Sequence, residues 1–135
     1  MASALYDKAR KAFADGDIDL LNDTIKCVLI DAADYTVDLA NHDFLDDVPS
    51  GARVGTPQTL GTKSTTAGVF DAADVTFSSV SGDQCEAILI YKDTGTEGTS
   101  PLIAYIDSAT GLPVTPNGGD IQIQWDSGTN KIFKL

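Results

Sequence analysis

The N-terminal segment "SALYDKARKAFADG" has the hydrophobic spacing of an amphipathic helix. Apolar side chains recur every four residues from Leu5 to Phe13, which places them on one face of a helix and leaves the charged residues on the other. Ser3 can cap the first turn, and Gly16 suits the left-handed position that ends many helices. The pattern predicts a helix over residues 4–14.

After this segment the helical period fades, and short apolar runs with β-branched residues and turn signals take over. The run "TIKCVLID" is typical of a mostly buried strand, whereas the Thr-, Gly- and Ser-rich stretch 52–68 is typical of an extended edge strand. The stretch "NHDFLDD" could form a helical turn within a long polar connection. The expected strands, besides 52–68, are 24–31, 35–37, 74–80, 86–93, 101–107, 120–126 and 131–135.

The connections between these runs predict how the strands pair. "TGTEGTS" and "SATGLPVTPNGG" are rich in Gly and Pro and too short for helical crossovers, which favours antiparallel neighbours. We therefore expect a mainly β fold: a single antiparallel β-sandwich or barrel-like domain over residues 1–135, with the N-terminal helix covering one end or one open face.

The segment "DIQIQWD" near the C-terminus alternates apolar and polar residues. Ile121, Ile123 and Trp125 are expected to point into the core, while Gln122 and Gln124 point to solvent. This pattern indicates a half-buried strand that Trp125 anchors.

The composition and net charge of the chain say little about its fold but exclude some classes of binding partner. The chain has 135 residues, 42% of them hydrophobic, and a formal net charge of −11 from 20 acidic and 9 basic residues. Such a charge opposes binding to nucleic acid and to anionic lipid, so neither partner is expected. No apolar run is long enough to span a membrane and no signal peptide precedes the helix, which favours a soluble protein made in the cytoplasm.

Three features could carry metal or thiol chemistry, and each departs from the pattern that the chemistry requires. Cys27 and Cys85 form no CxxC pair, so free thiols are expected, with a disulfide left open. "DGDIDLLNDTIK", which begins at Asp15, has the D-x-D-x-D spacing of a calcium loop. It has Leu20 where the loop requires Gly and Lys26 where it requires Glu, so we expect an acidic turn and no specific metal site.

Catalytic constellations are equally incomplete. His42 is the only histidine and lies among Asp43, Asp46 and Asp47, but no nucleophile motif accompanies it, so a surface role is expected. Carboxylate pairs such as that in "DAAD" are too common in an acidic chain to mark a glycosidase. "NGGD" lacks the Lys of a P-loop and is expected to be a turn. The sequence predicts no catalytic residue, cofactor, metal site or small-molecule substrate.

Several segments resemble a group of small virion proteins of tailed bacteriophages. They are "LYDKARKAFADGDIDLLNDTIKCVLID", "HDFLDDVPSGARV", "ILIYKDTG" and the ending "LIAYIDSATGLPVTPNGGDIQIQWDSGTNKIFKL". The most specific parts of the ending are "ATGLPVTPNGGDI", the strand with Trp125 and "NKIFKL". The resemblance implies a non-enzymatic structural protein of the capsid decoration, or cement, type. Such a protein would lie on the capsid surface of the virion and bind the major capsid protein and copies of itself, with a trimer favoured.

Two other functions remain as alternatives. A tail-associated or head-to-tail structural protein would also fit the resemblance to virion proteins. A β-module that binds a host surface or a glycan would need an exposed aromatic platform, whereas the aromatic residues here lie in strand-like runs that we expect to be buried.

Overall fold

The computed structural model describes residues 4–129 and 131–135. It confirms a mainly β, antiparallel fold with one short N-terminal helix. The regular elements are β1 (Ala4–Leu5), α1 (Asp7–Asp15), β2 (Ile25–Ile30), β3 (Arg53–Thr59), β4 (Val69–Phe70), β5 (Val75–Phe77), β6 (Ala87–Lys92), β7 (Leu102–Ile106), β8 (Ile121–Ile123) and β9 (Phe133–Lys134). Short 3-10 turns occur at Leu45–Asp47, Ser50–Ala52, Thr66–Gly68 and Glu97–Thr99.

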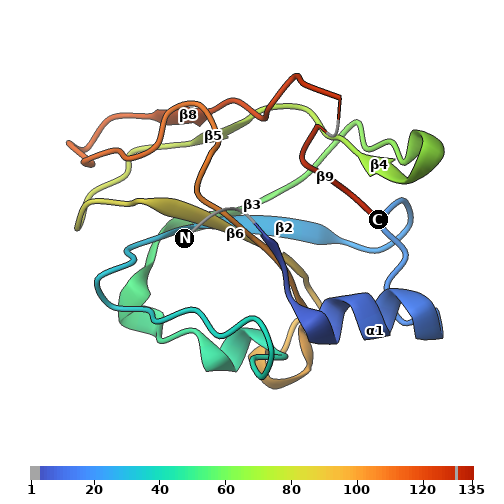
Figure 1. The fold of residues 1–135 in the computed structure, drawn as a ribbon. Helices are drawn as coiled ribbons and strands as arrows, with labels where there is room; N and C mark the ends of the chain where they lie inside the picture. The colour runs from blue at the N-terminus through green and yellow to red at the C-terminus, as the bar shows by residue number, and fades with distance from the viewer. Residues whose placement is uncertain (1–3, 130) are drawn as a thin grey trace.

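The strands form one large sheet and two small ribbons, all with antiparallel pairs. The large sheet has five strands in the order β1-β7-β6-β2-β3, and the ribbons pair β4 with β9 and β5 with β8. Figure 1 shows both ribbons above one face of the large sheet, with α1 and a long loop below the other. The layers resemble an open sandwich and do not close into a barrel among the described strands.

The central strands are apolar almost throughout because both faces of the large sheet are covered. Along β2, Cys27 and Leu29 point into the core beneath the ribbons, while Val28 and Ile30 point into the core on the opposite face. Period-two alternation thus divides one apolar run between two cores. These four side chains have no exposed surface, and burying a large apolar side chain contributes roughly 1.5–3 kcal/mol.

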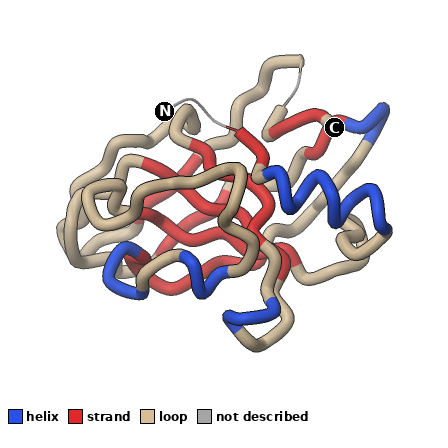
Figure 2. The backbone as a smooth tube through the Cα atoms, turned by 60° about the horizontal axis from the view of Figure 1, so that its bottom comes forward, coloured by secondary structure: helices blue, strands red, loops and turns tan. Residues whose placement is uncertain are grey.

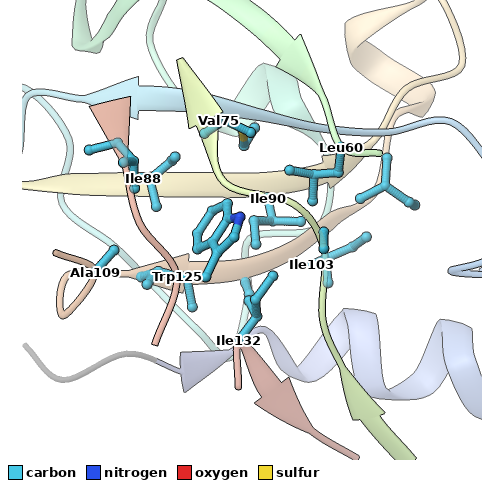
Figure 3. Packing of buried hydrophobic residues seen from close by; sticks show 14 of the residues in the cluster. Leu60, Val75, Ile88, Ile90, Ile103, Ala109, Trp125 and Ile132 are labelled. Atoms are coloured by element: carbon cyan, nitrogen blue, oxygen red, sulfur yellow. The ribbon is translucent and has the colours of Figure 1, made fainter. Parts of the chain in front are cut away.

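The core beneath the ribbons is centred on the C-terminal segment. Figure 3 shows Trp125 among Val75, Ile90, Ile103 and Ile132, side chains from both layers. Ile121, Ile123 and Trp125 are 7%, 0% and 6% exposed, whereas Gln122 and Gln124 face solvent. The alternation expected for this segment is confirmed, and the regular strand ends at Ile123.

The opposite face of the large sheet is covered without another sheet. Figure 2, turned so that this face comes forward, shows α1 and a loop with short helical turns lying over the strands. Tyr6, Tyr35, Leu45 and Val48 insert from this cover into the second core. No helix in the described part of the chain is long and apolar enough to cross a membrane.

The predicted start of the helix is wrong by about one turn. Ala4 and Leu5 form β1 against β7, and Tyr6 has the extended conformation of an N-cap at φ −73° and ψ 143°. Leu5 enters the core beneath the ribbons and Tyr6 the opposite core, as expected for successive residues of a strand. The proposed cap Ser3 lies outside the described residues. Gly16 ends the helix at φ +81°, as expected.

The predicted strand at 35–37 is also wrong. This segment belongs to the loop that covers the large sheet, because the Tyr35 side chain turns into the second core instead of joining a ladder. The strands expected near 24–31, 74–80, 86–93, 101–107, 120–126 and 131–135 are present with shorter bounds. The helical turn expected in "NHDFLDD" is present as Leu45–Asp47.

The edge strand expected in 52–68 is confirmed for β3, but its open edge is protected. Pro57 has no N–H to offer a neighbouring strand, and the Gln58 side chain donates a hydrogen bond to the Thr56 carbonyl at 3.0 Å. Beyond β3 the chain leaves the sheet. This edge is therefore poorly suited to accept a strand from another protein.

Candidate functional site

His42 lies at the end of a buried chain of hydrogen bonds that the sequence did not reveal. The Tyr6 and Tyr35 hydroxyls are 2.8 Å apart, and the Tyr35 hydroxyl is 2.8 Å from His42 Nδ1. The His42 ring also stacks on Tyr35 with ring centroids 5.4 Å apart. The expectation of a surface histidine is wrong, because His42 is half-buried and bonded.

The direction of these hydrogen bonds follows from one backbone group. The Asp38 N–H points at His42 Nδ1 from 3.3 Å, so Nδ1 accepts and cannot carry a proton of its own. Tyr35 therefore donates to His42, and Tyr6 donates to Tyr35. Burial raises the pKa of Tyr35 to about 12 and raises the pKa of Tyr6 still further, so both hydroxyls keep their protons.

The tyrosine end of this network is closed off from solvent. Tyr6 is fully buried and Tyr35 is 4% exposed. The network ties the N-terminal segment to the loop that covers the large sheet, so we assign it a structural role.

The three carboxylates around His42 form one of two acidic clusters in the described part of the chain. Asp43, Asp46 and Asp47 bring one carboxylate oxygen each to within 4.8 Å of the others. Asp47 Oδ2 accepts the Asp43 N–H at 2.8 Å, and this bond lowers the pKa of Asp47. Desolvation, followed by the hydrogen bond with Asp47, raises the pKa of Asp43. The Asp47 carboxylate, which also lies 3.4 Å from the Phe44 N–H, thus closes the turn that leads into Leu45–Asp47.

The second cluster lies at the end of β2. Oxygen atoms of Asp31, Asp34 and Asp83 lie within 4.8 Å of one another. Asp31 is buried, and its Oδ1 accepts the Ala33 N–H at 2.9 Å. Glu86 Oε1 accepts the Ala32 N–H at 3.1 Å, while its buried Oε2 has no hydrogen-bond partner. The Asp31 and Glu86 carboxylates thus bind the backbone of the turn that leaves the large sheet.

The calcium-like spacing after α1 does not gather its carboxylates. Asp19 accepts the Leu21 and Asn22 backbone N–H groups at 3.1 and 3.2 Å and the Asn22 side-chain amide at 2.7 Å. These bonds, with that from the Asn22 side chain the strongest, lower the pKa of Asp19. Asp15 forms an ion pair with Lys11 on α1. Neither Asp15 nor Asp19 belongs to a three-carboxylate cluster in the described chain, so the segment is an acidic turn.

Both cysteines are free and buried, as expected. Cys27 lies in β2, and burial raises its thiol pKa to about 12. Burial and the neighbouring Glu86 and Asp31 carboxylates raise the thiol pKa of Cys85 to about 11. Each thiol therefore stays protonated at neutral pH and behaves as a small apolar side chain.

One surface differs from the acidic remainder of the molecule. We call it the β1–β9 trough: a line of hollows beside β9 that β1 and α1 border on the other side. Leu5, Phe13, Ile106 and Phe133 provide apolar walls, and Arg10, Lys131 and Lys134 provide positive charge. The sequence pattern did not indicate this surface, because its residues come from opposite ends of the chain.

The cations of the trough contrast with those around the large sheet. Lys26, Arg53 and Lys92 pair with Asp93, Glu97 and Asp23 at 3.0, 2.7 and 3.1 Å. Lys131 and Lys134 have no carboxylate partner among residues 4–129 and 131–135, and Arg10 pairs only with Asp7 of its own helix. The trough is thus a positive surface on a protein with a net charge of −11.

Comparison with known proteins adds no assignment to this geometry. No protein-family model matches the sequence, and no curated protein is significantly similar to it.

Proposed function

We propose that this chain is a non-enzymatic structural protein of a tailed-bacteriophage virion that decorates and stabilises the capsid lattice. The observation that carries the proposal is the resemblance of nearly the whole chain to small phage virion proteins, most specifically from Ala109 to Leu135. In the fold, that segment supplies β8 and β9, one strand of each ribbon, and with them part of the core between the ribbons and the large sheet.

The arrangement of reactive groups supports a structural role. The buried Tyr6 and Tyr35 and the half-buried His42 form a chain of hydrogen bonds, and one carboxylate of each acidic cluster, that of Asp31 or of Asp47, accepts a backbone N–H. Each of these groups stabilises a turn or a loop. The two thiols are protonated and buried in the strands and their connections.

The aromatic residues weigh against the glycan-binding alternative. A glycan-binding platform requires an exposed aromatic ring, but the only exposed large hydrophobic side chains in the described chain are Leu21 and Leu135. Trp125 is 6% exposed, and Tyr91 and Tyr105 are also buried. The tail-associated alternative is not affected by this observation and stays the second candidate.

A protein that stabilises a capsid lattice binds more tightly when several copies act together. A small domain offers limited contact area, whereas several copies that bind adjacent capsid subunits gain avidity and link those subunits. We therefore propose a symmetric oligomer, most simply a trimer, bound where capsid subunits meet. The contact surface that we favour includes α1, because the open edge of β3 is protected by Pro57.

The test is reconstitution on phage capsids that have been stripped of this protein. Purified protein is added, bound copies are counted by sedimentation, and the heat resistance of the particles is measured. A fixed number of copies per capsid subunit with a gain in heat resistance would support the proposal. Binding only to tails or to one vertex of the head would assign the protein to the tail-associated class.

A further inference from the structure

The β1–β9 trough is a continuous feature of the surface. Three adjoining hollows of about 190, 250 and 290 Å³ make it up, and neighbouring hollows share Phe133 or Lys134 of β9 as wall residues. Phe13 and Phe133 approach across one end, with ring centroids 6.5 Å apart. The trough therefore follows β9 along its length, on the side away from β4.

Both strands beside the trough have an unpaired edge. Among the described strands, β1 pairs only with β7, and β9 pairs only with β4. In Figure 1, β9 lies between β4 and the N-terminal strand and helix, and no ladder joins β9 to β1. The trough is thus a break in the strand pairing between the two layers of the sandwich.

The register shows which backbone groups face this break. Tyr6 N–H donates to the Ile103 carbonyl, and Leu5 lies opposite Ala104, so Leu5 directs its own N–H and C=O away from β7. Leu135 N–H donates to the Gly68 carbonyl, and Lys134 lies opposite Val69, so Lys134 directs its backbone groups away from β4. Both residues line the trough.

The side chains of the trough select the character of an occupant. Leu5, Phe13 and Phe133 favour apolar side chains, while Lys131 and Lys134 lack a carboxylate partner within the described residues. One acidic side chain, that of Asp126, lies at the far end. A segment with alternating apolar and acidic residues would place the apolar side chains on the walls and the acidic ones on the cations.

We propose that the β1–β9 trough binds an extended segment of another protein, with acidic and apolar side chains in alternation, which adds as a strand beside β9. Its backbone bonds to the free groups of Lys134 and Leu5, as in β-strand addition, and its carboxylates pair with Arg10, Lys131 and Lys134. The inference depends only on the trough and not on the proposed virion role. In that role, the capsid protein would supply the segment.

Charge argues against a second copy of this chain as the occupant. Another copy brings a further net charge of −11, and its acidic loops are held in place by their own bonds, such as that from Asn41 to Asp38. A segment of a different protein needs only local negative charge. The choice of occupant can therefore be tested with peptides.

The experiment measures binding of three dye-labelled peptides, each about eight residues long, near the upper range of strand lengths. One repeats Val-Glu, the second repeats Val-Lys, and the third is the Val-Glu peptide with alternate Val residues replaced by Pro. Fluorescence anisotropy gives the affinity, and amide chemical shifts in NMR spectra locate the contact. We expect the Val-Glu peptide to bind at least about tenfold more tightly than either other peptide, with shifts at Leu5 and Lys134.

Matched variants identify the surface. Lys134→Glu and Lys131→Glu are each expected to weaken Val-Glu binding about tenfold, because each replaces an attractive charge with a repulsive one. Lys8→Glu makes the same change in charge on an exposed residue of α1 that does not line the trough, and should change affinity by less than about twofold. Thermal melts of each variant verify that the fold is intact.

Other outcomes would overturn the inference. Equal affinity for the Val-Glu and Val-Lys peptides, or equal loss in all three variants, would exclude charge recognition in the trough. Unchanged binding of the Pro-containing peptide would exclude strand addition. Self-association that Lys134→Glu abolishes would make a second copy the occupant. None of these measurements uses a phage particle, so their failure is separate from failure of the capsid test.

Discussion

The indole Nε1 of Trp125 donates a hydrogen bond to the Ala73 carbonyl oxygen at 3.1 Å. The backbone N–H of Trp125 also donates to Asp74 Oδ1 at 3.0 Å. Trp125 therefore does more than fill the core, because it holds the end of β8 against the segment that leads into β5. Replacement of the indole removes a specific bond as well as apolar surface.

We predict that Trp125→Phe lowers the free energy of unfolding by about 1–3 kcal/mol. The variant leaves the Ala73 carbonyl without its partner and loses part of the buried ring. Chemical denaturation monitored by circular dichroism measures the change. Gln124→Ala is the control, since its exposed side chain should contribute close to nothing. Equal stability of Trp125→Phe and wild type would show that the bond to Ala73 is not significant.

Removal of residues 120–135 is predicted to prevent folding. The truncation exposes the sites of Ile121, Ile123 and Trp125, each worth roughly 1.5–3 kcal/mol, in a domain whose total stability is expected to be about 5–15 kcal/mol. It also removes β9, the partner of β4. Calorimetry should find no cooperative transition, whereas deletion of Leu135 alone should leave one. A native-like melt of the long truncation would make this segment an appendage.

The Tyr6–Tyr35 pair is predicted to show coupling. Tyr35→Phe should cost about 1–3 kcal/mol, because the Tyr6 hydroxyl stays buried without an acceptor. Tyr6→Phe should cost less, since Tyr35 still donates to His42. The double variant should be more stable than the sum of the two losses implies, as urea unfolding can measure. Strict additivity would contradict the proposed direction of the hydrogen bonds.

Acid is predicted to destabilise the protein in part through Asp93. The Gly95 N–H at 2.9 Å, and then Lys26, hold the pKa of Asp93 below its ordinary value of 3.8. A carboxyl group whose pKa is lower in the folded than in the unfolded state stabilises the fold at any pH above its unfolded pKa. This stabilisation is lost as the pH falls through the folded-state pKa. Melting temperatures between neutral pH and strongly acidic pH should therefore fall more steeply for wild type than for Asp93→Asn.

The same variant supplies the size of the effect at neutral pH. Asp93→Asn should lower stability by about 1 kcal/mol, or roughly 3 °C in melting temperature. Asp17→Asn is the control, because the exposed Asp17 side chain has no bonded partner among the described residues. If Asp17→Asn and Asp93→Asn changed the acid response equally, the effect would come from net charge alone.

Both thiols are predicted to resist modification in the folded protein. Cys27 and Cys85 are fully buried, with pKa values raised to about 12 and about 11, so few thiolates are present at mildly alkaline pH. A thiol reagent should modify neither residue before denaturation and both after it. Reductant should leave the melting temperature unchanged. Rapid reaction of either thiol in the native state would show that its strand opens locally.

The spacing of apolar and polar residues predicted those strands whose burial on one or both faces is visible in a short stretch of sequence. The alternation around Gln122 and the apolar run of β2 each reflect which faces are covered, and the structure confirms both. β1 was mistaken for helix because a two-residue strand is too short to show a period, and Leu5 fits either pattern. The β-propensity of Tyr35 favours a strand at this position. In the structure, burial of its side chain in the second core overrides that propensity.

The tyrosine–histidine network and the β1–β9 trough could not be predicted, because both are formed by residues that lie far apart in the sequence. Tyr6, Tyr35 and His42 meet only after the loop folds over the sheet, and the β1–β9 trough joins Leu5 to Lys134. A signal did exist in the charges, since basic residues are few and two of them lie close together near the C-terminus as Lys131 and Lys134. That neither has a carboxylate partner among the described residues could not be known before the structure.

The pairing of β1 with β7 also determines when the protein can fold during synthesis. Ala4 and Leu5 are synthesised long before their partners Tyr105 and Ala104. Closing so long a loop costs chain entropy that only the completed sheet can offset. β1 is therefore synthesised long before it can pair, and it joins the large sheet only after β7 is complete.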